Sequence, residues 1–203
     1  MANVLTGDYN PSGKLPLTIA RCAGQIPVQY NHPNGSAWHQ GMSVGFTDYV
    51  DLPHRPRYCF GHGLSFTSFA YTDLVMDKKE VSPSESLGLS FKVTNTGSVS
   101  GTEVVQLYLS DVQASMTRPV KELQGFARVS LAPGETREVW FEIQPSQMAF
   151  QDQDMRWKIE KGEIKVQLGS SSEDIRLEGS FMITENQWMN GRERAFLATG
   201  SFS

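Results

Sequence analysis

The sequence predicts a mainly β protein, in which an antiparallel sandwich of two sheets follows an irregular, loop-rich N-terminal segment. From about residue 66, apolar and polar residues alternate with a period of two, as in half-buried strands. Clusters of Gly, Pro, Asn and Ser separate the alternating runs. We therefore expect an irregular segment over 1–65, a sandwich over 66–183 and a C-terminal tail over 184–203.

The first 65 residues show no sustained periodicity and are rich in proline, which discourages helices and central strands. The best strand candidate is 15–19, and 31–56 has the composition of a long loop. Such a segment cannot close a core of its own. We expect it to be the tail of a larger domain or an extension packed on its neighbour.

The sandwich is predicted from about seven alternating runs over roughly 115 residues, a pattern typical of immunoglobulin and fibronectin type III folds. An antibody-type domain is disfavoured because no Cys…Trp…Cys pattern is present. The polar tail is expected to pack loosely or to be disordered. The predicted strands are 71–76, 87–94, 104–110, 127–131, 139–143, 164–168 and 175–181.

Composition excludes several function classes. The net charge is −4 with no basic block, which argues against a nucleic-acid surface, and no apolar run is long enough for a membrane helix. The start of the chain has no signal-peptide pattern, so cytoplasmic, periplasmic and secreted locations all stay open. Cys22 and Cys59 are expected to be free thiols rather than a disulfide.

Two familiar ligand sites are also disfavoured. The stretch Gly7–Thr18 resembles a phosphate-binding loop, but its glycines are one residue too far apart and Lys14 is followed by Leu15 instead of Ser or Thr. The four histidines have no metal-ligand spacing. We therefore predict no cofactor and no metal.

Carboxylates are plentiful, and paired carboxylates are the machinery of glycoside hydrolysis. They fall at polar strand positions or turns, so we expect a solvated sheet face and nominate no catalytic residue. These residues are Glu103, Glu135, Glu138, Glu142, Glu160 and Glu163.

Three stretches stand out as candidate contact sites. Gly61 and Gly63 bracket His62 where the periodicity changes, and we expect positive φ or close backbone approach at this junction. The loop 110–119 is polar and leads into Thr117–Leu123, where a surface salt-bridge cluster competes with a contact to a neighbouring domain or a sugar. The candidate substrate- or interface-proximal residues are Asp111, Arg118, Lys121 and Glu122, together with Tyr108 and Trp140 at outward-facing strand positions.

Taken in order, the motifs resemble the C-terminal portion of glycoside hydrolase family 3, the β-glucosidase and β-xylosidase family, over nearly the whole chain. Each motif alone is weak, but the ordered set is specific. The motifs are GDYNPSGKLP (7–16), GQIP (24–27), FGHGLS (60–65), VTNTG (93–97), EVVQLY (103–108), RPVKELQGF (118–126), LAPGE (131–135) and GSS (169–171).

The resemblance implies that 1–65 ends an α/β sandwich domain and that a fibronectin type III-like domain follows. The family's (β/α)₈ barrel with its aspartate nucleophile and the segment with its acid/base glutamate are not in this sequence, so the chain alone is predicted to be inactive. The implied partners are the (β/α)₈ barrel and the α/β sandwich domain, in the same parent chain or another. The sequence departs from the family pattern at 19–21 and at Cys59, which leaves the substrate undefined.

Two alternatives stay open. Besides a C-terminal piece of a family 3 enzyme, the sequence allows a stand-alone sandwich that binds carbohydrate or protein. It also allows one chain of a split family 3 enzyme. A binding platform requires exposed aromatic side chains, for which Tyr108 and Trp140 are the candidates. A split enzyme requires residues 1–65 to pack on a second chain.

Overall fold

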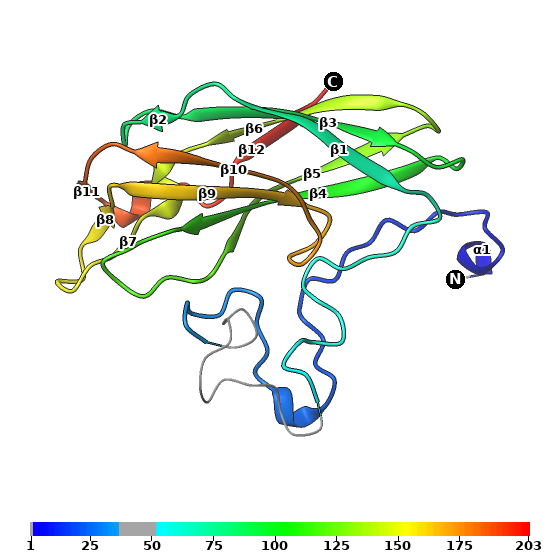
Figure 1. The fold of residues 1–203 in the computed structure, drawn as a ribbon, viewed down its shortest axis with the longest axis horizontal. Coiled ribbons are helices and arrows are strands. Elements are labelled where there is room, and N and C mark those ends of the chain that lie inside the picture. Colours follow the sequence, from blue (N-terminus) through cyan, green and yellow to red (C-terminus); the bar gives the residue numbers. More distant parts are fainter. Residues whose placement is uncertain (1, 37–51) are drawn as a thin grey trace.

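The computed structural model describes residues 2–36 and 52–203, and it confirms a mainly β fold. Two sheets face each other in the sandwich, and a small third sheet lies at one end (Figure 1). The four-stranded sheet has the order β1 (Phe69–Met76), β3 (Leu87–Asn95), β6 (Thr136–Ile143), β12 (Thr199–Phe202). The five-stranded sheet has the order β2 (Glu80–Val81), β10 (Ile175–Ile183), β9 (Gly162–Gly169), β4 (Gly101–Asp111), β5 (Glu122–Leu131). The small sheet has the order β11 (Gln187–Met189), β8 (Trp157–Ile159), β7 (Phe150–Gln151).

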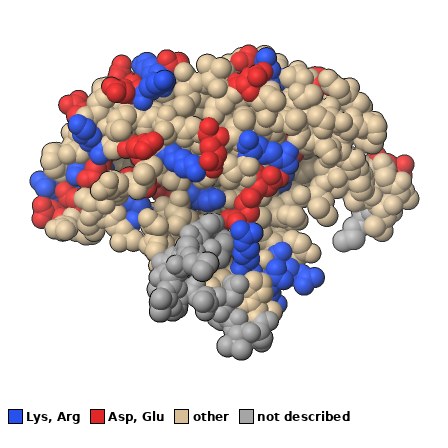
Figure 2. Space-filling model, in the orientation of Figure 1, with Lys and Arg blue, Asp and Glu red and all other residues tan. Residues whose placement is uncertain are grey.

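Helical elements are short in the described ranges: α1 (Ala2–Leu5) and the 3₁₀ turns η1 (Ala23–Gln25), η3 (Pro145–Met148) and η4 (Gly191–Glu193). None of the described helices has the length and apolar character that crossing a membrane requires. On the face in Figure 2, acidic and basic side chains are interspersed over the sandwich, in keeping with the small net charge.

The core lies between the two large sheets and follows the period-two pattern. Along β3, Leu87, Leu89, Phe91 and Val93 are buried, while Lys92 between them is exposed. The rings of Phe91 and Phe141, on neighbouring strands, lie 6.2 Å apart. All seven predicted alternating runs form strands, because in each the inward side chains can be buried together.

The tail differs from the expectation of loose packing. After β11, β12 pairs with β6 through four opposed residues and completes the four-stranded sheet. Its sequence, TGSF, has no alternation of apolar side chains, and all four residues are exposed. Backbone hydrogen bonding therefore holds this strand, and backbone bonding leaves no signal in side-chain periodicity.

The N-terminal segment packs on the outer face of the five-stranded sheet, below the sandwich in Figure 1. The strand expected at 15–19 is only an isolated bridge between Ile19 and Tyr58. Leu15 N–H still donates to the His62 carbonyl at 2.9 Å, but Pro16 has no N–H to extend the ladder.

The glycines at the junction behave as predicted. Gly61 has φ +78°, and a Cβ there would lie 2.0 Å from Gln106 Oε1. A Cβ on Gly63 would lie 2.4 Å from the Gly13 carbonyl oxygen. Only a residue without a side chain allows these approaches, so the segment and the sandwich are in close contact here.

Candidate functional site

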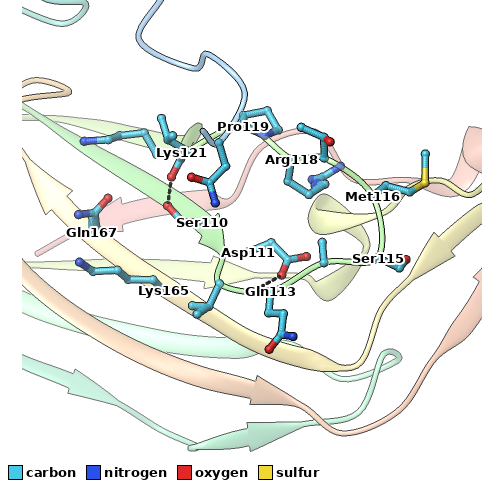
Figure 3. Close-up of a pocket in the computed structure, with 15 residues that line it drawn as sticks. Ser110, Asp111, Gln113, Ser115, Met116, Arg118, Pro119, Lys121, Lys165 and Gln167 are labelled. Carbon is cyan, nitrogen blue, oxygen red and sulfur yellow. Dashed lines mark hydrogen bonds between the residues drawn. The ribbon is translucent and has the colours of Figure 1, made fainter. Parts of the chain in front are cut away.

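The loop between β4 and β5 borders a polar hollow with a volume of about 730 Å³ (Figure 3). Most of the lining comes from 110–121, and the rest comes from Asn34 and from Lys165 and Gln167 on β9. Its charged side chains are Asp111, Arg118, Lys121 and Lys165. The hollow thus offers mainly hydrogen-bond donors and positive charge.

The N-terminal segment holds this loop through the backbone. Asn34 N–H donates to the Arg118 carbonyl, and Val120 N–H donates to the His32 carbonyl, both at 3.0 Å. Pro33 and Pro119 lie opposite each other in an isolated bridge between these bonds. The position of the loop therefore depends on a segment about 85 residues earlier in the chain.

Arg118 is fixed by three contacts. Its Nη2 lies 3.1 Å from Glu122 Oε2 and 3.4 Å from the Met148 carbonyl oxygen, and its guanidinium lies over the Phe150 ring. Its Nε is buried and has no hydrogen-bond partner among the described residues. A buried donor without an acceptor is costly, so this N–H marks a place where a further partner would be stabilising.

Lys121 is buried rather than placed in a surface cluster with Glu122. Its Nζ donates to the Ser172 carbonyl at 2.6 Å and lies 4.0 Å from Glu173 Oε1. Burial lowers the pKa of Lys121, and the Glu173 carboxylate opposes this effect. Lys121 and Glu122 are adjacent in sequence, so their side chains diverge and Glu122 pairs with Arg118 instead.

Asp111 is the carboxylate of the hollow. Burial raises its pKa, and the positive charge of Arg118 opposes the increase. Its Oδ1 accepts the Gln113 N–H at 3.2 Å and so shapes the start of the loop. The arrangement suits binding to polar groups, such as a peptide loop or sugar hydroxyls.

Tyr108 points away from the sandwich core, as the alternation implies, but it is 0% exposed. The edge of its ring packs on Tyr30, which stacks on Phe60 at 4.3 Å. The N-terminal segment therefore covers Tyr108, which removes it from any exposed platform. Trp140 lies on β6, in the other sheet, and stays partly exposed.

The six candidates therefore separate into distinct places. Asp111, Arg118 and Lys121 line the hollow, and Glu122 joins them through Arg118. Tyr108 lies under the N-terminal segment, and Trp140 lies on the opposite sheet. Both cysteines are free: Cys22 is exposed and Cys59 is partly buried.

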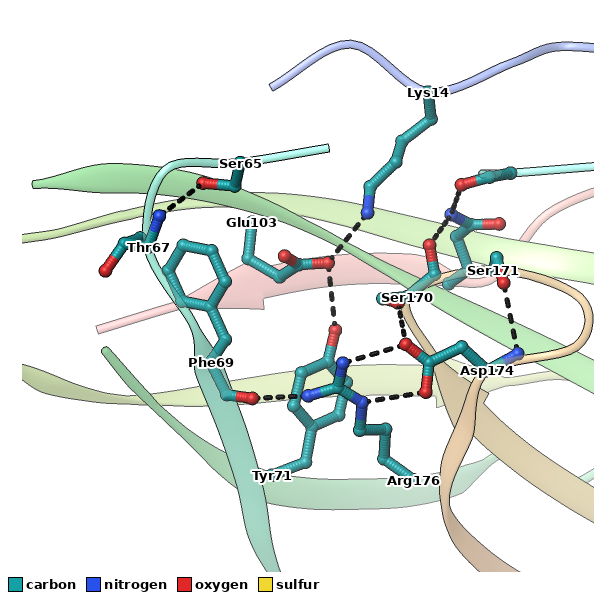
Figure 4. A network of polar contacts seen from close by, with 12 residues as sticks. Lys14, Ser65, Thr67, Phe69, Tyr71, Glu103, Ser170, Ser171, Asp174 and Arg176 are labelled. Carbon is teal, nitrogen blue, oxygen red and sulfur yellow. Dashed lines mark hydrogen bonds and ion pairs between the residues drawn. The ribbon is translucent and has the colours of Figure 1, made fainter. Parts of the chain in front are cut away.

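A second polar group, centred on Glu103, was not predicted (Figure 4). The expectation of a solvated Glu103 is wrong, because its side chain is buried, pairs with Lys14 Nζ at 3.1 Å and accepts from Tyr71 Oη at 3.2 Å. Burial raises the pKa of Glu103, and Lys14 opposes the increase. The strand alternation could have predicted this burial, because Glu103 falls at an inward-facing position together with Val105 and Leu107.

Arg176 extends this group along β10. It pairs with Asp174 at 2.8 Å, lies over the Tyr71 ring and donates to the Phe69 carbonyl. Asp174 in turn accepts from Ser170 Oγ at 2.6 Å. The group therefore joins Lys14 of the N-terminal segment to both large sheets.

Comparison with known proteins assigns the two parts of the chain separately. Residues 1–66 match the glycosyl hydrolase family 3 C-terminal domain, and residues 103–172 match a fibronectin type III-like domain. The chain is 42% identical to the periplasmic β-glucosidase of Salmonella typhimurium, over 89% of this chain and 24% of that protein. It is 38% identical to a putative β-xylosidase of Formosa agariphila, over 86% of this chain and 22% of that protein.

The fold agrees with these matches. The crystal structure of a β-glucosidase from Listeria innocua in complex with glucose superposes with a TM-score of 0.83 at 36% identity, over 90% of this chain and 26% of that one. The chain thus spans about a quarter of the length of the relatives it matches.

Proposed function

This chain belongs to glycoside hydrolase family 3 as its C-terminal portion, and we propose that it is a non-catalytic support for the barrel and α/β sandwich domains of a β-glycosidase. The complete enzyme would hydrolyse β-glucosides or related β-glycosides. This chain would hold the other domains in place and contribute the loop 110–119 to the edge of the active site.

The observation that carries the proposal is the two-sided N-terminal segment. On one side, the side chains of Lys14 and Tyr30 contact Glu103 and Tyr108, and the Phe60 carbonyl accepts the Ser172 N–H. Away from these contacts it exposes large apolar side chains: Leu5 at 87%, Leu17 at 52%, Ile26 at 68% and Leu64 at 75%. Repeated exposure of such side chains on one segment is typical of an interaction surface, here for the rest of the α/β domain.

A chimera tests the supporting role. The last quarter of the Salmonella periplasmic β-glucosidase would be replaced by this whole chain, and hydrolysis of p-nitrophenyl β-glucoside would be measured. We expect an active chimera, no hydrolysis by this chain alone, and loss of soluble chimera when Leu17 and Ile26 both become Asp. The matched control places Asp at Val99 and Met155, which are exposed on the sandwich and on the turn after β7. An inactive chimera that is folded would contradict the proposal.

The role at the active-site edge rests on the polar hollow, the unpartnered Arg118 Nε and the backbone bonds to 32–34. In the active chimera, shortening the loop by removing 113–116 should raise KM with a smaller effect on kcat, because substrate contacts are lost while the chemistry remains. Shortening the turn at 152–155, beyond β7, is the control. Unchanged kinetics after the loop deletion would exclude the edge role.

The alternatives receive less support. The described residues of the N-terminal segment pack on the chain's own sandwich, which removes the main reason to propose a split enzyme. Burial of Tyr108 removes one of the two aromatics expected for a stand-alone carbohydrate module.

A further inference from the structure

The four-stranded sheet lies on the side of the sandwich opposite the N-terminal segment (Figure 1). A groove crosses its outer face. Its volume is about 470 Å³. Strand register places Val75, Ser90, Trp140 and Ser201 directly opposite one another, one from each strand. The indole of Trp140 therefore has a serine on either side and no bulky neighbour in its row.

The next row brings two carboxylates to the same groove. Gly88 and Thr199 both lie opposite Glu142, and Gly88 N–H donates to Asp77 Oδ1 at 3.0 Å. Asp77 and Glu142 are both exposed. A Cβ on Gly88 would lie 3.0 Å from Asp77 Oδ2, so the missing side chain leaves the space between the carboxylates open.

Trp140 differs from the other tryptophans that the structure describes. Arg194 lies over the Trp157 ring at 5.3 Å, and Arg156 lies over the Trp188 ring at 5.4 Å. Within residues 2–36 and 52–203, no cation or aromatic ring covers Trp140, and its indole N–H has no hydrogen-bond partner. Trp140 is partly exposed and lines the groove, so its ring and its donor lack a partner at a place that a ligand can reach.

We propose that this groove binds a neutral oligosaccharide, with one sugar ring stacked on Trp140. The apolar C–H face of a sugar fits an indole ring, while Asp77 and Glu142 accept bonds from its hydroxyls and the serines exchange bonds with them. No Lys or Arg is among the described residues that line the groove, so an anionic ligand would meet only repulsion. This site does not depend on the proposed role in a family 3 enzyme.

Binding can be measured on the full chain by titration with cellotetraose, followed by calorimetry and by ¹⁵N–¹H spectra. We expect a dissociation constant on the order of 1 mM or tighter, as for a shallow site with one stacked ring. Chemical-shift changes should centre on the Trp140 indole N–H and the backbone of β6 and β12. Trp140→Ala should weaken binding at least tenfold.

Two further variants and one control keep the test independent of folding. Gly88→Val places a side chain against Asp77 and fills the space between the carboxylates. Glu142→Gln keeps the shape but weakens one acceptor, so both variants should weaken binding. Trp188→Ala removes an exposed tryptophan outside the groove and should leave binding unchanged. Urea unfolding of each variant verifies that it is folded.

Three results would overturn the proposal. They are no binding by the native chain at about 20 mM sugar, equal binding by folded Gly88→Val and Glu142→Gln variants, or loss of binding in Trp188→Ala. A lysine peptide that binds through Asp77 and Glu142 while cellotetraose does not would instead identify a site for cations.

Discussion

Lys14 Nζ and Glu103 Oε1 lie 3.1 Å apart and join residues 89 positions apart in the chain. Lys14 belongs to the stretch that resembles a phosphate-binding loop, and its ammonium binds a buried carboxylate on β4 instead. This pair is therefore one link between the sandwich and the segment that matches the family 3 C-terminal domain.

Replacing Lys14 by Met should destabilise the fold by about 3 kcal/mol, because buried Glu103 would lose its ion pair and keep, among the described residues, the Tyr71 hydroxyl as hydrogen-bond donor. The double variant with Glu103→Met should recover much of this loss, since two apolar side chains leave no buried charge. Urea unfolding measures both. Lys92→Met, which breaks an exposed pair with Asp73, is the control and should change the stability far less, because solvent screens exposed ion pairs. Equal losses for Lys14 and Lys92 would show that the buried pair carries no special weight.

Glu103 should also give the stability a distinctive pH dependence. Burial raises the pKa of Glu103 in the folded state, so its contribution is greatest at low pH and is lost as pH rises through that pKa. The unfolding free energy of the native chain minus that of Glu103→Gln should therefore fall as the pH rises above the ordinary range of a glutamate pKa.

Glu85 supplies a control of opposite sign. Hydrogen bonds from Ser82 lower the pKa of Glu85, with a further contribution from Lys78, so its contribution is present at neutral pH and lost in acid. The same difference measured with Glu85→Gln should rise with pH. Parallel trends for the two variants would rule out the assigned cause.

Gly61 and Gly134 have nearly equal positive φ, so alanine variants at the two positions distinguish the cost of backbone strain from the cost of a side-chain clash. Gly61→Ala should destabilise the fold by about 3 kcal/mol, because the new Cβ adds a clash with Gln106 to the strain of positive φ. Gly134→Ala, at φ +76° with nothing within 4 Å, should cost only about 1 kcal/mol. Thermal unfolding of both variants tests this difference, and similar losses would mean that Gln106 moves aside freely.

Tyr108→Phe should cost about 1–3 kcal/mol even though the ring is kept. The hydroxyl donates to buried Gln106 Oε1, while Gln106 Nε2 donates to the Gly61 and Ser170 carbonyls. Tyr9→Phe, at an exposed tyrosine, is the control for loss of a hydroxyl. Unfolding curves that coincide for the two variants would show that the amide finds another donor.

The sequence was sufficient for the sandwich because strand periodicity is a local signal. Leu87 to Val93 shows this directly, since each alternate side chain must face the core. The junction glycines were also predicted, because Gly next to aromatics implies close approach. By contrast, β12, with its sequence TGSF, is held by backbone hydrogen bonds to β6, and its side chains show no pattern that predicts a strand.

The candidate site was predicted only in part. The loop between β4 and β5 and its charged residues follow from the sequence, whereas the pairing of Arg118 with Glu122 and the burial of Lys121 depend on where the strand begins. Tyr108 shows the limit most clearly. Its outward direction was correct, but its cover comes from Tyr30, and such a contact between distant residues leaves no trace in local sequence.

The order in which a ribosome delivers these parts gives the docked N-terminal segment a further consequence. Lys14, Tyr30 and Phe60 are synthesised before the sandwich, but their contacts with Glu103, Tyr108 and Ser172 exist only after β4 and β9 have emerged and paired. Until then the segment lacks its contacts with the sandwich, and the side chains that make these contacts stay open to chaperones or to aggregation. Slow pairing of β4 with β9 would therefore lower the yield of folded protein during synthesis.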